Sequence, residues 1–379
     1  MMAYCPPMNS PETRPVAVLF GTRPEAIKLC PVILALRRAG LVVEAVTTGQ
    51  HRELLADVLP PFGIVPDRDL ELMRPRQSLD YLLGTGIERI GRYFESASPA
   101  AVVVQGDTTS TLAAALAAFH HRIPVAHVEA GLRTYDMDLP FPEEMNRRAT
   151  TVVARWHFAP TKGAAENLSH EGIVERVYVT GNTVVDALRM ILESAPVISA
   201  DLQSFLDRGP YVLADAHRRE SWGEPIGNIA RALAAVVDAA PDLRVVFVTH
   251  PNPLARGPAD AALAGNPRVR VLDALPYPQF LKVLSGAVVA VSDSGGVQEE
   301  GPTLGVPVLV TRAITERPEG ISAGAVRLVG TDFDRIVSDA LALVRDPAAR
   351  AAMAEAGRGL YGDGHASERI ADVIAAAVL

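Results

Sequence analysis

The chain of 379 residues has few of the residue types that mark several large classes of protein. Its two cysteines, Cys5 and Cys30, do not form a C-x-x-C pair, which argues against a disulfide scaffold and a cysteine-based zinc site. None of its nine histidines falls in an H-x-x-x-H or H-E-x-x-H pattern, so no metal site is expected. Aromatic residues make up 5% of the chain and are not interleaved with basic ones, so we expect no base-stacking surface.

Positive charge and long apolar runs are also scarce. Lys and Arg number 36 against 44 Asp and Glu, and no basic stripe is present, so neither nucleic acid nor a membrane is expected as a partner. No uncharged apolar run reaches the ~18 residues of a membrane span, and residues 1–14 lack the apolar core of a signal peptide. Hydrophobic residues make up 49%, enough for large cores. We expect a cytoplasmic enzyme.

Short β-branched runs alternate with longer stretches of helical periodicity along almost the whole chain. This alternation is typical of parallel sheets with helices on both faces. In the first half, strands are expected at Val16–Phe20, Val42–Thr47, Ala101–Val104, Val125–Val128, His157–Ala159 and Val177–Val179. In the second half, they are expected at Tyr211–Ala214, Val245–Val248, Val269–Leu272, Val288–Val291, Val306–Val310 and Val326–Val329.

The pattern predicts an α/β fold of two doubly wound Rossmann-like domains, with the active site in the cleft between them. The expected boundaries are a disordered tail at 1–14, a first domain at 15–190, a linker region at 191–210, a second domain at 211–362 and a C-terminal helix at 363–379. We expect that last helix to pack back on the first domain. In such sheets ligands lie beyond the carboxyl ends of the strands, so polar residues placed there are the candidates for function.

The first such motif is GTRPEAIK, directly after the strand Val16–Phe20. Arg23 and Lys28 are placed to meet an anion at a helix N-terminus, although both also fit an ordinary solvated helix start. The motif is neither a Walker A loop nor G-x-G-x-x-G, which disfavours nucleoside triphosphate and nicotinamide cofactors.

Three carboxylates follow strands or begin a helix in the first domain. Asp107 lies in GDTTST, where helix capping is the alternative role. Glu129 closes a buried strand, where an acid is costly unless it is paired or functional. Glu143 follows a Pro-rich turn and also fits an ordinary first-turn acid. If all three converge at one sheet edge, they suit acid and base work on one substrate.

Two motifs of the second domain also follow strands. His217, beside Arg218, is placed to act as an acid, a base or a phosphate ligand, although a lone His after a strand is more often structural. The SDSGG turn, with Ser294, Gly295 and Gly296, exposes backbone N–H groups that suit a phosphate. Glu300 then suits the hydroxyls of a ribose. No G-x-S-x-G nucleophile elbow is present.

From Val16 to about Val329 the chain resembles the non-hydrolysing UDP-N-acetylglucosamine 2-epimerases of bacteria. The resemblance rests on GTRPEAIK, TGQHRELL, GDTTST, HVEAGLRT, FPEEMNR, FAPT, GNTVVDAL, HRRE, HPNP, SDSGGVQEE and TERPE, in that order. It implies a glycosyltransferase-B type fold, a homodimer without cofactor, and interconversion of UDP-N-acetylglucosamine and UDP-N-acetylmannosamine. The sequence departs from the family pattern around Asp215, at Gly301 where Ala is usual, and at Ala325 where Thr is usual.

The resemblance also implies roles for individual residues. The catalytic positions are Asp107, Glu129, Glu143 and His217, and the substrate-binding positions are Arg23, Lys28, Arg147, Ser294, Gly295, Gly296, Glu300 and Arg317. A second, allosteric UDP-N-acetylglucosamine site is implied at Gln50, Arg76, Gln77, Arg218 and His250. Four alternatives remain open: a related UDP-sugar substrate, a hydrolysing 2-epimerase, a transferase of the same architecture, and a catalytically silent sensor of a sugar nucleotide.

Overall fold

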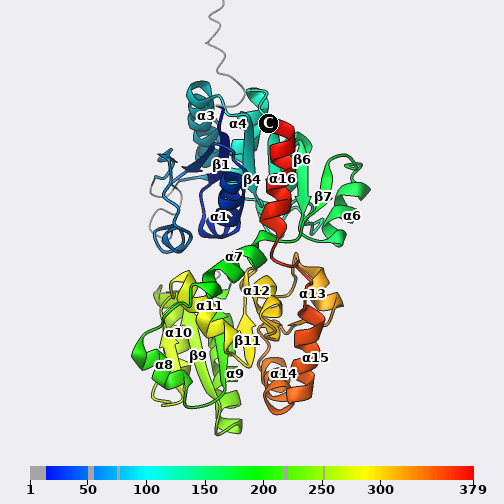
Figure 1. Ribbon diagram of the computed structural model, residues 1–379. Coiled ribbons are helices and arrows are strands. Elements are labelled where there is room, and N and C mark those ends of the chain that lie inside the picture. Colours follow the sequence, from blue (N-terminus) through cyan, green and yellow to red (C-terminus); the bar gives the residue numbers. More distant parts are fainter. Residues whose placement is uncertain (1–13, 50–54, 75–76, 217–220, 251) are drawn as a thin grey trace, which may run out of the picture. The chain divides into compact units, whose positions relative to one another are not determined.

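The computed structural model describes residues 14–49, 55–74, 77–216, 221–250 and 252–379. The chain forms two compact units (Figure 1). The first runs to Ala187 and is completed by Gly362–Leu379, and the second is Leu188–Tyr361. The C-terminal helix α16 (Ala366–Val378) therefore belongs to the first unit, where it packs against α1 (Arg23–Arg38).

The first unit contains a seven-stranded sheet in the order β3-β2-β1-β4-β5-β6-β7, and its neighbouring strands pair in parallel. Its strands are β1 (Val16–Phe20), β2 (Val43–Thr47), β3 (Arg68–Asp69), β4 (Ala101–Gln105), β5 (Val125–Val128), β6 (Trp156–Ala159) and β7 (Val177–Val179). Its other helices are η2 (Pro60–Phe62), α3 (Leu79–Ala97), α4 (Thr109–His120), α5 (Glu143–Val153), α6 (Lys162–His170) and the start of α7 (Thr183–Glu193).

The second unit contains a six-stranded sheet in the order β10-β9-β8-β11-β12-β13, again parallel. Its strands are β8 (Tyr211–Ala216), β9 (Arg244–Thr249), β10 (Val269–Leu272), β11 (Val289–Ser292), β12 (Val308–Val310) and β13 (Val326–Leu328). Its helices are α8 (Ala200–Leu206), α9 (Glu224–Ala239), α10 (Pro253–Leu263), α11 (Tyr277–Ser285), α12 (Val297–Thr303), α13 (Pro318–Ser322), α14 (Phe333–Arg345) and α15 (Pro347–Gly357).

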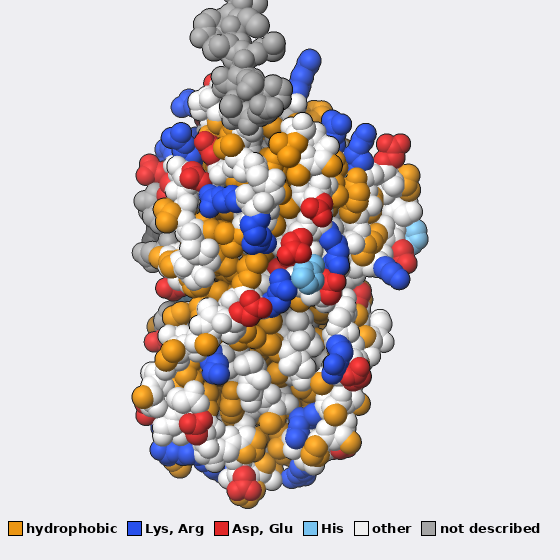
Figure 2. All heavy atoms as spheres, viewed as in Figure 1, with side chains coloured by type: hydrophobic (Ala, Val, Ile, Leu, Met, Phe, Trp, Pro, Cys, Tyr) orange, Lys and Arg blue, Asp and Glu red, His pale blue; other side chains and the backbone are white. Residues whose placement is uncertain are grey.

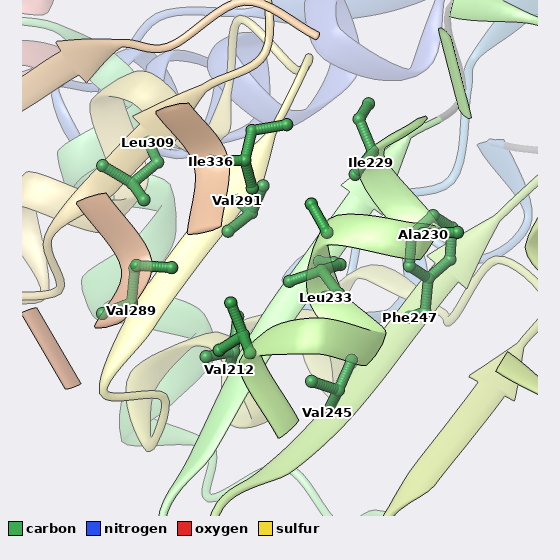
Figure 3. Packing of buried hydrophobic residues seen from close by; sticks show 14 of the residues in the cluster. Val212, Ile229, Ala230, Leu233, Val245, Phe247, Val289, Val291, Leu309 and Ile336 are labelled. Atoms are coloured by element: carbon green, nitrogen blue, oxygen red, sulfur yellow. The ribbon is translucent and has the colours of Figure 1, made fainter. Parts of the chain in front are cut away.

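Both cores form between strand faces and the helices that cover them. In the second unit, Val212 and Phe247 from the sheet pack with Leu233 of α9 and Ile336 of α14, all fully buried (Figure 3). In the first unit, the alanine-rich α4 contributes five buried alanines beside Phe94 of α3. Because alanine is small and favours helix, α4 can lie close to both the sheet and α3.

The order of the strands reverses once in each sheet, and at the reversal the loops that follow two neighbouring strands lie side by side. In the first unit β1 is paired with both β2 and β4, so the loops that follow β1 and β4 lie side by side. In the second unit β8 is paired with both β9 and β11, which brings together the loops that follow β8 and β11. Such switch points are where doubly wound sheets bind ligands.

The predicted α/β class and two doubly wound units are confirmed, and each expected strand is found within two residues of its predicted bounds. The structure differs in two places. The region 191–210, expected to be a linker, belongs to the second unit and contains α8. Strand β8 runs two residues beyond Ala214, so Asp215 lies inside it, buried, and accepts a hydrogen bond from Ser292 Oγ at 3.2 Å.

Within the described residues, no helix is both long and apolar enough to cross a bilayer. On the face shown in Figure 2, acidic and basic side chains are interspersed rather than gathered by sign.

Candidate functional site

The loops after β1 and β4 form the switch point of the first unit, and each leads into a helix capped by threonine. Thr22 Oγ1 accepts from Glu25 N at the start of α1, and Thr108 Oγ1 accepts from Thr111 N at 3.1 Å at the start of α4. Thr108, and not Asp107, therefore caps α4. The capping role that the sequence left open for Asp107 is wrong, and its carboxylate is available for other work.

The Asp107 side chain is held by α5. Its Oδ2 accepts from Arg147 Nη2 at 2.6 Å and from Arg147 Nε at 3.0 Å, while the Asp107 carbonyl accepts from Asn146 Nδ2 at 2.9 Å. Arg147 is buried, so this charge-assisted pair is shielded from solvent on its basic side. Arg147, which the resemblance assigns to substrate binding, thus donates two hydrogen bonds to the candidate catalytic carboxylate.

Glu129 lies one residue beyond β5 and is buried. Its backbone is left-handed at φ 64°, a conformation that costs of order 1–3 kcal/mol for a residue other than glycine and persists only where its surroundings impose it. Its Oε2 accepts from Lys28 Nζ of α1 and from Asn182 Nδ2 at 3.4 Å. A buried carboxylate is thereby given a cation and a neutral donor.

Glu143 is the first residue of α5 and is half-buried, whereas its neighbour Glu144 is fully buried. Glu144 accepts from the backbone N–H of Thr134 at 3.0 Å, from that of Tyr135 at 3.1 Å, and from Arg147 Nη1 at 3.1 Å. Of the two adjacent acids, Glu144 anchors the loop after β5. Glu143 is left as the partly exposed one.

Two histidines are buried beneath these loops. His127 of β5 hydrogen-bonds through Nε2 to the carbonyl of Gly106 at 2.8 Å, and it is the register partner of His157 in β6. Burial, with a smaller contribution from the nearby Arg133, lowers the pKa of His127 to about 3 and that of His157 to about 4. Both imidazoles are therefore neutral, and His127 holds the Gly106 peptide without adding charge.

The second unit places its candidate residues after β11. In the turn that leads to α12, the Ser294 N–H donates to Ser292 Oγ at 2.9 Å, and Gly296 precedes the helix. Glu300 is buried on α12, and its Oε1 accepts from Tyr277 Oη of α11 at 2.9 Å. The carboxylate is thus fixed by a neighbouring helix.

Arg317 lies against the same turn. Its Nε donates to Glu299 Oε1 at 2.5 Å, and a Cβ built on Gly295 would lie 3.0 Å from its Nη1. Glycine at 295 therefore lets the guanidinium approach the backbone.

The glycine at 301 is explained by packing. An added Cβ would lie 2.3 Å from Val308 Cγ2, so this departure from the family pattern belongs to the packing of α12 on β12.

The sequence-predicted residues divide by unit. Six of the predicted residues lie around the strand ends of the first unit: Arg23, Lys28, Asp107, Glu129, Glu143 and Arg147. Five lie around the strand ends of the second unit: Ser294, Gly295, Gly296, Glu300 and Arg317. His217, Arg218, Gln50 and Arg76 lie outside the described residues. Gln77 belongs to the first unit, where its Oε1 accepts from Arg74 N at 3.1 Å. His250 belongs to the second, and its ring lies 5.3 Å from that of Trp222.

Sequence reasoning missed three residues of this site. Glu144 and Asn182 have a place only through tertiary contacts, and Glu25 was given no role within the GTRPEAIK motif. The one available signal was the spacing of Thr22 and Glu25, which fits a capping box. Among the residues that the structure describes, no group of three or more His, Cys, Asp or Glu side chains is arranged to hold a metal ion.

Comparisons with known proteins show the family of the chain. A family model described as UDP-N-acetylglucosamine 2-epimerase matches residues 35–375. The UDP-N-acetylglucosamine 2-epimerases of Escherichia coli (strain K12) and Yersinia pestis are each 43% identical to the chain, over 95% and 94% of it and over 98% and 96% of the relatives. The crystal structure of the UDP-GlcNAc 2-epimerase from Neisseria meningitidis bound to UDP-GlcNAc is 42% identical, with a TM-score of 0.88 over 95% of this chain and 99% of that one. Because these matches span nearly its whole length, the chain belongs to the UDP-N-acetylglucosamine 2-epimerase family.

Proposed function

We propose that the chain interconverts UDP-N-acetylglucosamine and UDP-N-acetylmannosamine by inverting C2 of the sugar. Family membership supports the reaction. The structural observation that carries it is the placement of Asp107 and Glu129 directly after the paired strands β4 and β5. Inverting a carbon requires proton transfer on both of its faces, and paired carboxylates at one sheet edge supply such groups.

The proposed route is elimination followed by re-addition. A carboxylate takes the C2 proton, the C–H electrons form the C1=C2 double bond, and the C1–O bond breaks so that UDP leaves with its electron pair. Re-addition of UDP to C1, with a proton delivered to the opposite face of C2, gives the epimer. Elimination and re-addition together are redox-neutral, so the reaction needs no oxidant or reductant.

Asp107, Glu129 and Glu143 are the proposed proton-transfer groups. The Arg147 bonds orient the Asp107 carboxylate, and Lys28 compensates the charge of Glu129. Asp107 and Glu129 are therefore each held in one orientation before substrate arrives, which is how positioned groups lower a barrier.

Departure of UDP builds negative charge on the β-phosphate, and the second unit carries the groups assigned to it. Arg317 and the backbone of Gly295 and Gly296 are the proposed diphosphate ligands, with Ser294 beside them and Arg23 from the first unit. Glu300, already fixed by Tyr277, is the proposed acceptor for the ribose hydroxyls. His217 is assigned to the phosphate side by the sequence motif alone.

The test is product identification by ¹H and ³¹P NMR after incubation with UDP-N-acetylglucosamine. The proposal predicts a mixture of the two UDP-sugars. Free N-acetylmannosamine with UDP as the main products would place the chain in the hydrolysing branch, and turnover only in the presence of an acceptor would make it a transferase. A lack of turnover with any UDP-N-acetylhexosamine would leave a sensor.

We further propose that a second molecule of UDP-N-acetylglucosamine activates the enzyme. This rests on the motifs that contain Gln50, Arg76, Gln77, Arg218 and His250 and on the resemblance that implies the site. An effector that binds one conformation more tightly shifts the population toward it. We expect sigmoidal dependence on UDP-N-acetylglucosamine and a reverse reaction that stalls until some is added. Hyperbolic kinetics with full reverse activity would exclude this control.

A cytoplasmic homodimer completes the proposal, on the same resemblance. Sedimentation of the purified chain should give twice the mass of 40.3 kDa. A monomer that retains full turnover would refute the dimer as the working form.

A further inference from the structure

Glu25 has more hydrogen bonds than a helix cap requires. It is 2% exposed and is the third residue of α1. Its Oε2 accepts from the backbone N–H of Gly21 at 2.9 Å and of Thr22 at 2.6 Å, while Thr22 Oγ1 accepts from Glu25 N. This completes a capping box, and one carboxylate oxygen is enough for it.

The second oxygen is engaged by the loop after β4. Glu25 Oε1 accepts from Thr108 Oγ1 at 2.6 Å and from Thr111 Oγ1 at 2.7 Å, residues more than eighty positions away in the chain. One carboxylate therefore joins the turn that leads to Arg23 with the loop that carries Asp107. Hydrogen bonds to a buried carboxylate are among the stronger ones in proteins.

The Thr108 hydroxyl is the shortest link between the two loops. Its oxygen accepts from Thr111 N at 3.1 Å, and its single hydrogen has two acceptors within reach, Glu25 Oε1 at 2.6 Å and Thr111 Oγ1 at 3.1 Å. The closer, charged carboxylate is the stronger acceptor. The Thr111 hydroxyl has one hydrogen and two acceptors, Glu25 Oε1 and the carbonyl of Gln105, each at 2.7 Å. Thr108 directly follows Asp107, so the link acts one residue from the candidate catalytic acid.

We propose that Glu25 is a positioning residue for the reaction, acting through Thr108 to fix the Asp107 loop against the turn that carries Arg23. The inference rests on the proposed function, since it assigns Glu25 to the same proton transfer. Misplacing a reacting group by about 1 Å can cost roughly 10²-fold in rate. Loss of the link should therefore lower kcat and change KM for UDP-N-acetylglucosamine much less, because all the proposed nucleotide ligands except Arg23 lie in the second unit.

The test compares Thr108→Val, which deletes the hydroxyl, with Thr108→Ser, which keeps it. Tyr93→Phe is the matched control, because Tyr93 Oη donates to Glu44 Oε2 at the same 2.6 Å in the same unit. We expect kcat to fall roughly 10²-fold in Thr108→Val, to stay near wild type in Thr108→Ser, and to be unaffected in Tyr93→Phe. Full kcat in Thr108→Val, or an equal fall in Tyr93→Phe, would overturn the inference.

A double-mutant cycle connects the effect to Glu25 itself. If Glu25→Gln and Thr108→Val break one shared bond, the kcat of the double variant should be little lower than that of the more impaired single variant. If the two losses are independent, their factors should multiply. Multiplied losses would mean that Glu25 acts only as a cap of α1.

Hydrogen–deuterium exchange separates this inference from the proposed function. In Thr108→Val, a peptide that covers Gln105–Thr109 should exchange faster than in wild type and in Tyr93→Phe, whether or not the enzyme turns over. A wild-type chain that does not turn over, together with a loosened loop in Thr108→Val, would refute the proposed function and keep the positioning role. Unchanged exchange in this peptide would refute the positioning role.

Discussion

The two buried histidines of the first unit predict that this unit loses stability when the pH falls from 7 to 5. His127 is 0% exposed and His157 is 3% exposed. Burial is the main cause that lowers their pKa values, to about 3 and about 4, from the ordinary 6.5. In the unfolded chain both histidines keep the ordinary pKa, so below pH 6.5 the unfolded chain binds protons that the folded chain does not bind.

The sign and size follow from proton linkage. Above pH 6.5 both states are neutral, and the full stability is present. As the pH falls below 6.5 only the unfolded state binds protons, and stability is lost until the folded pKa values of His127 and His157 are reached. Between pH 7 and pH 5 the loss is about 2 kcal/mol for each histidine, or about 4 kcal/mol for both. Part of a typical domain stability of about 5–15 kcal/mol is thereby removed.

The pH window isolates the histidines from the acids. Arg133 and Arg148 lower the pKa of Glu171, and a hydrogen bond from Arg369 lowers that of Asp363. The stabilisation from these two acids is lost only when the pH falls below their unfolded values, near 4.

The assay is urea unfolding followed by the fluorescence of Trp156, which lies in β6 beside His157. A Trp222→Phe background removes the one other tryptophan, which belongs to the second unit. We expect the free energy of unfolding to fall by about 4 kcal/mol from pH 7 to pH 5, and His157→Gln to remove about half of that dependence. A flat profile, or a slope unchanged by His157→Gln, would show that the histidines are not neutral and buried as described.

Two further predictions concern single side chains. Asp107→Asn should lower turnover by roughly 10²-fold or more, as loss of a general acid or base does. It should lower the melting temperature only modestly, because Thr108 still caps α4 and Glu144 still pairs with the buried Arg147. Unchanged activity would remove Asp107 from the chemistry. Gly301→Ala should lower the free energy of unfolding by about 1–2 kcal/mol, because the overpacking outweighs the gain in helix propensity. The added Cβ would lie 2.3 Å from Val308 Cγ2. A Val308→Ala background should abolish that loss, and additive losses in the double variant would contradict the packing explanation.

Much of the fold could be predicted because local pattern and topology agree. Strands β1 and β4 are continuous apolar runs, and they are buried on both faces. Helix α10 carries a weak sequence signal because Gly257 and Pro258 stand in its middle, residues that normally argue against a helix. Strand β3 has two residues, both exposed, and no hydrophobic signal.

The site was predictable at the level of positions and not of partners. Placing Asp107 and Glu129 after strands needs only the strand ends, which a sequence indicates. The cap of α4 was ambiguous among four consecutive polar residues, since the choice depends on where the helix begins, which sequence does not fix to one residue. The bonds that Thr108 donates to Glu25 and Arg147 donates to Asp107 depend on which strands and helices are neighbours, and no local pattern states that.

The central claim is that the chain inverts C2 by removing its proton, and NMR in deuterium oxide tests this most directly. Incubation of purified protein with UDP-N-acetylglucosamine should give UDP-N-acetylmannosamine that carries deuterium at C2, followed by the same label in recovered substrate. UDP-sugars that keep hydrogen at C2 after prolonged incubation would contradict the account.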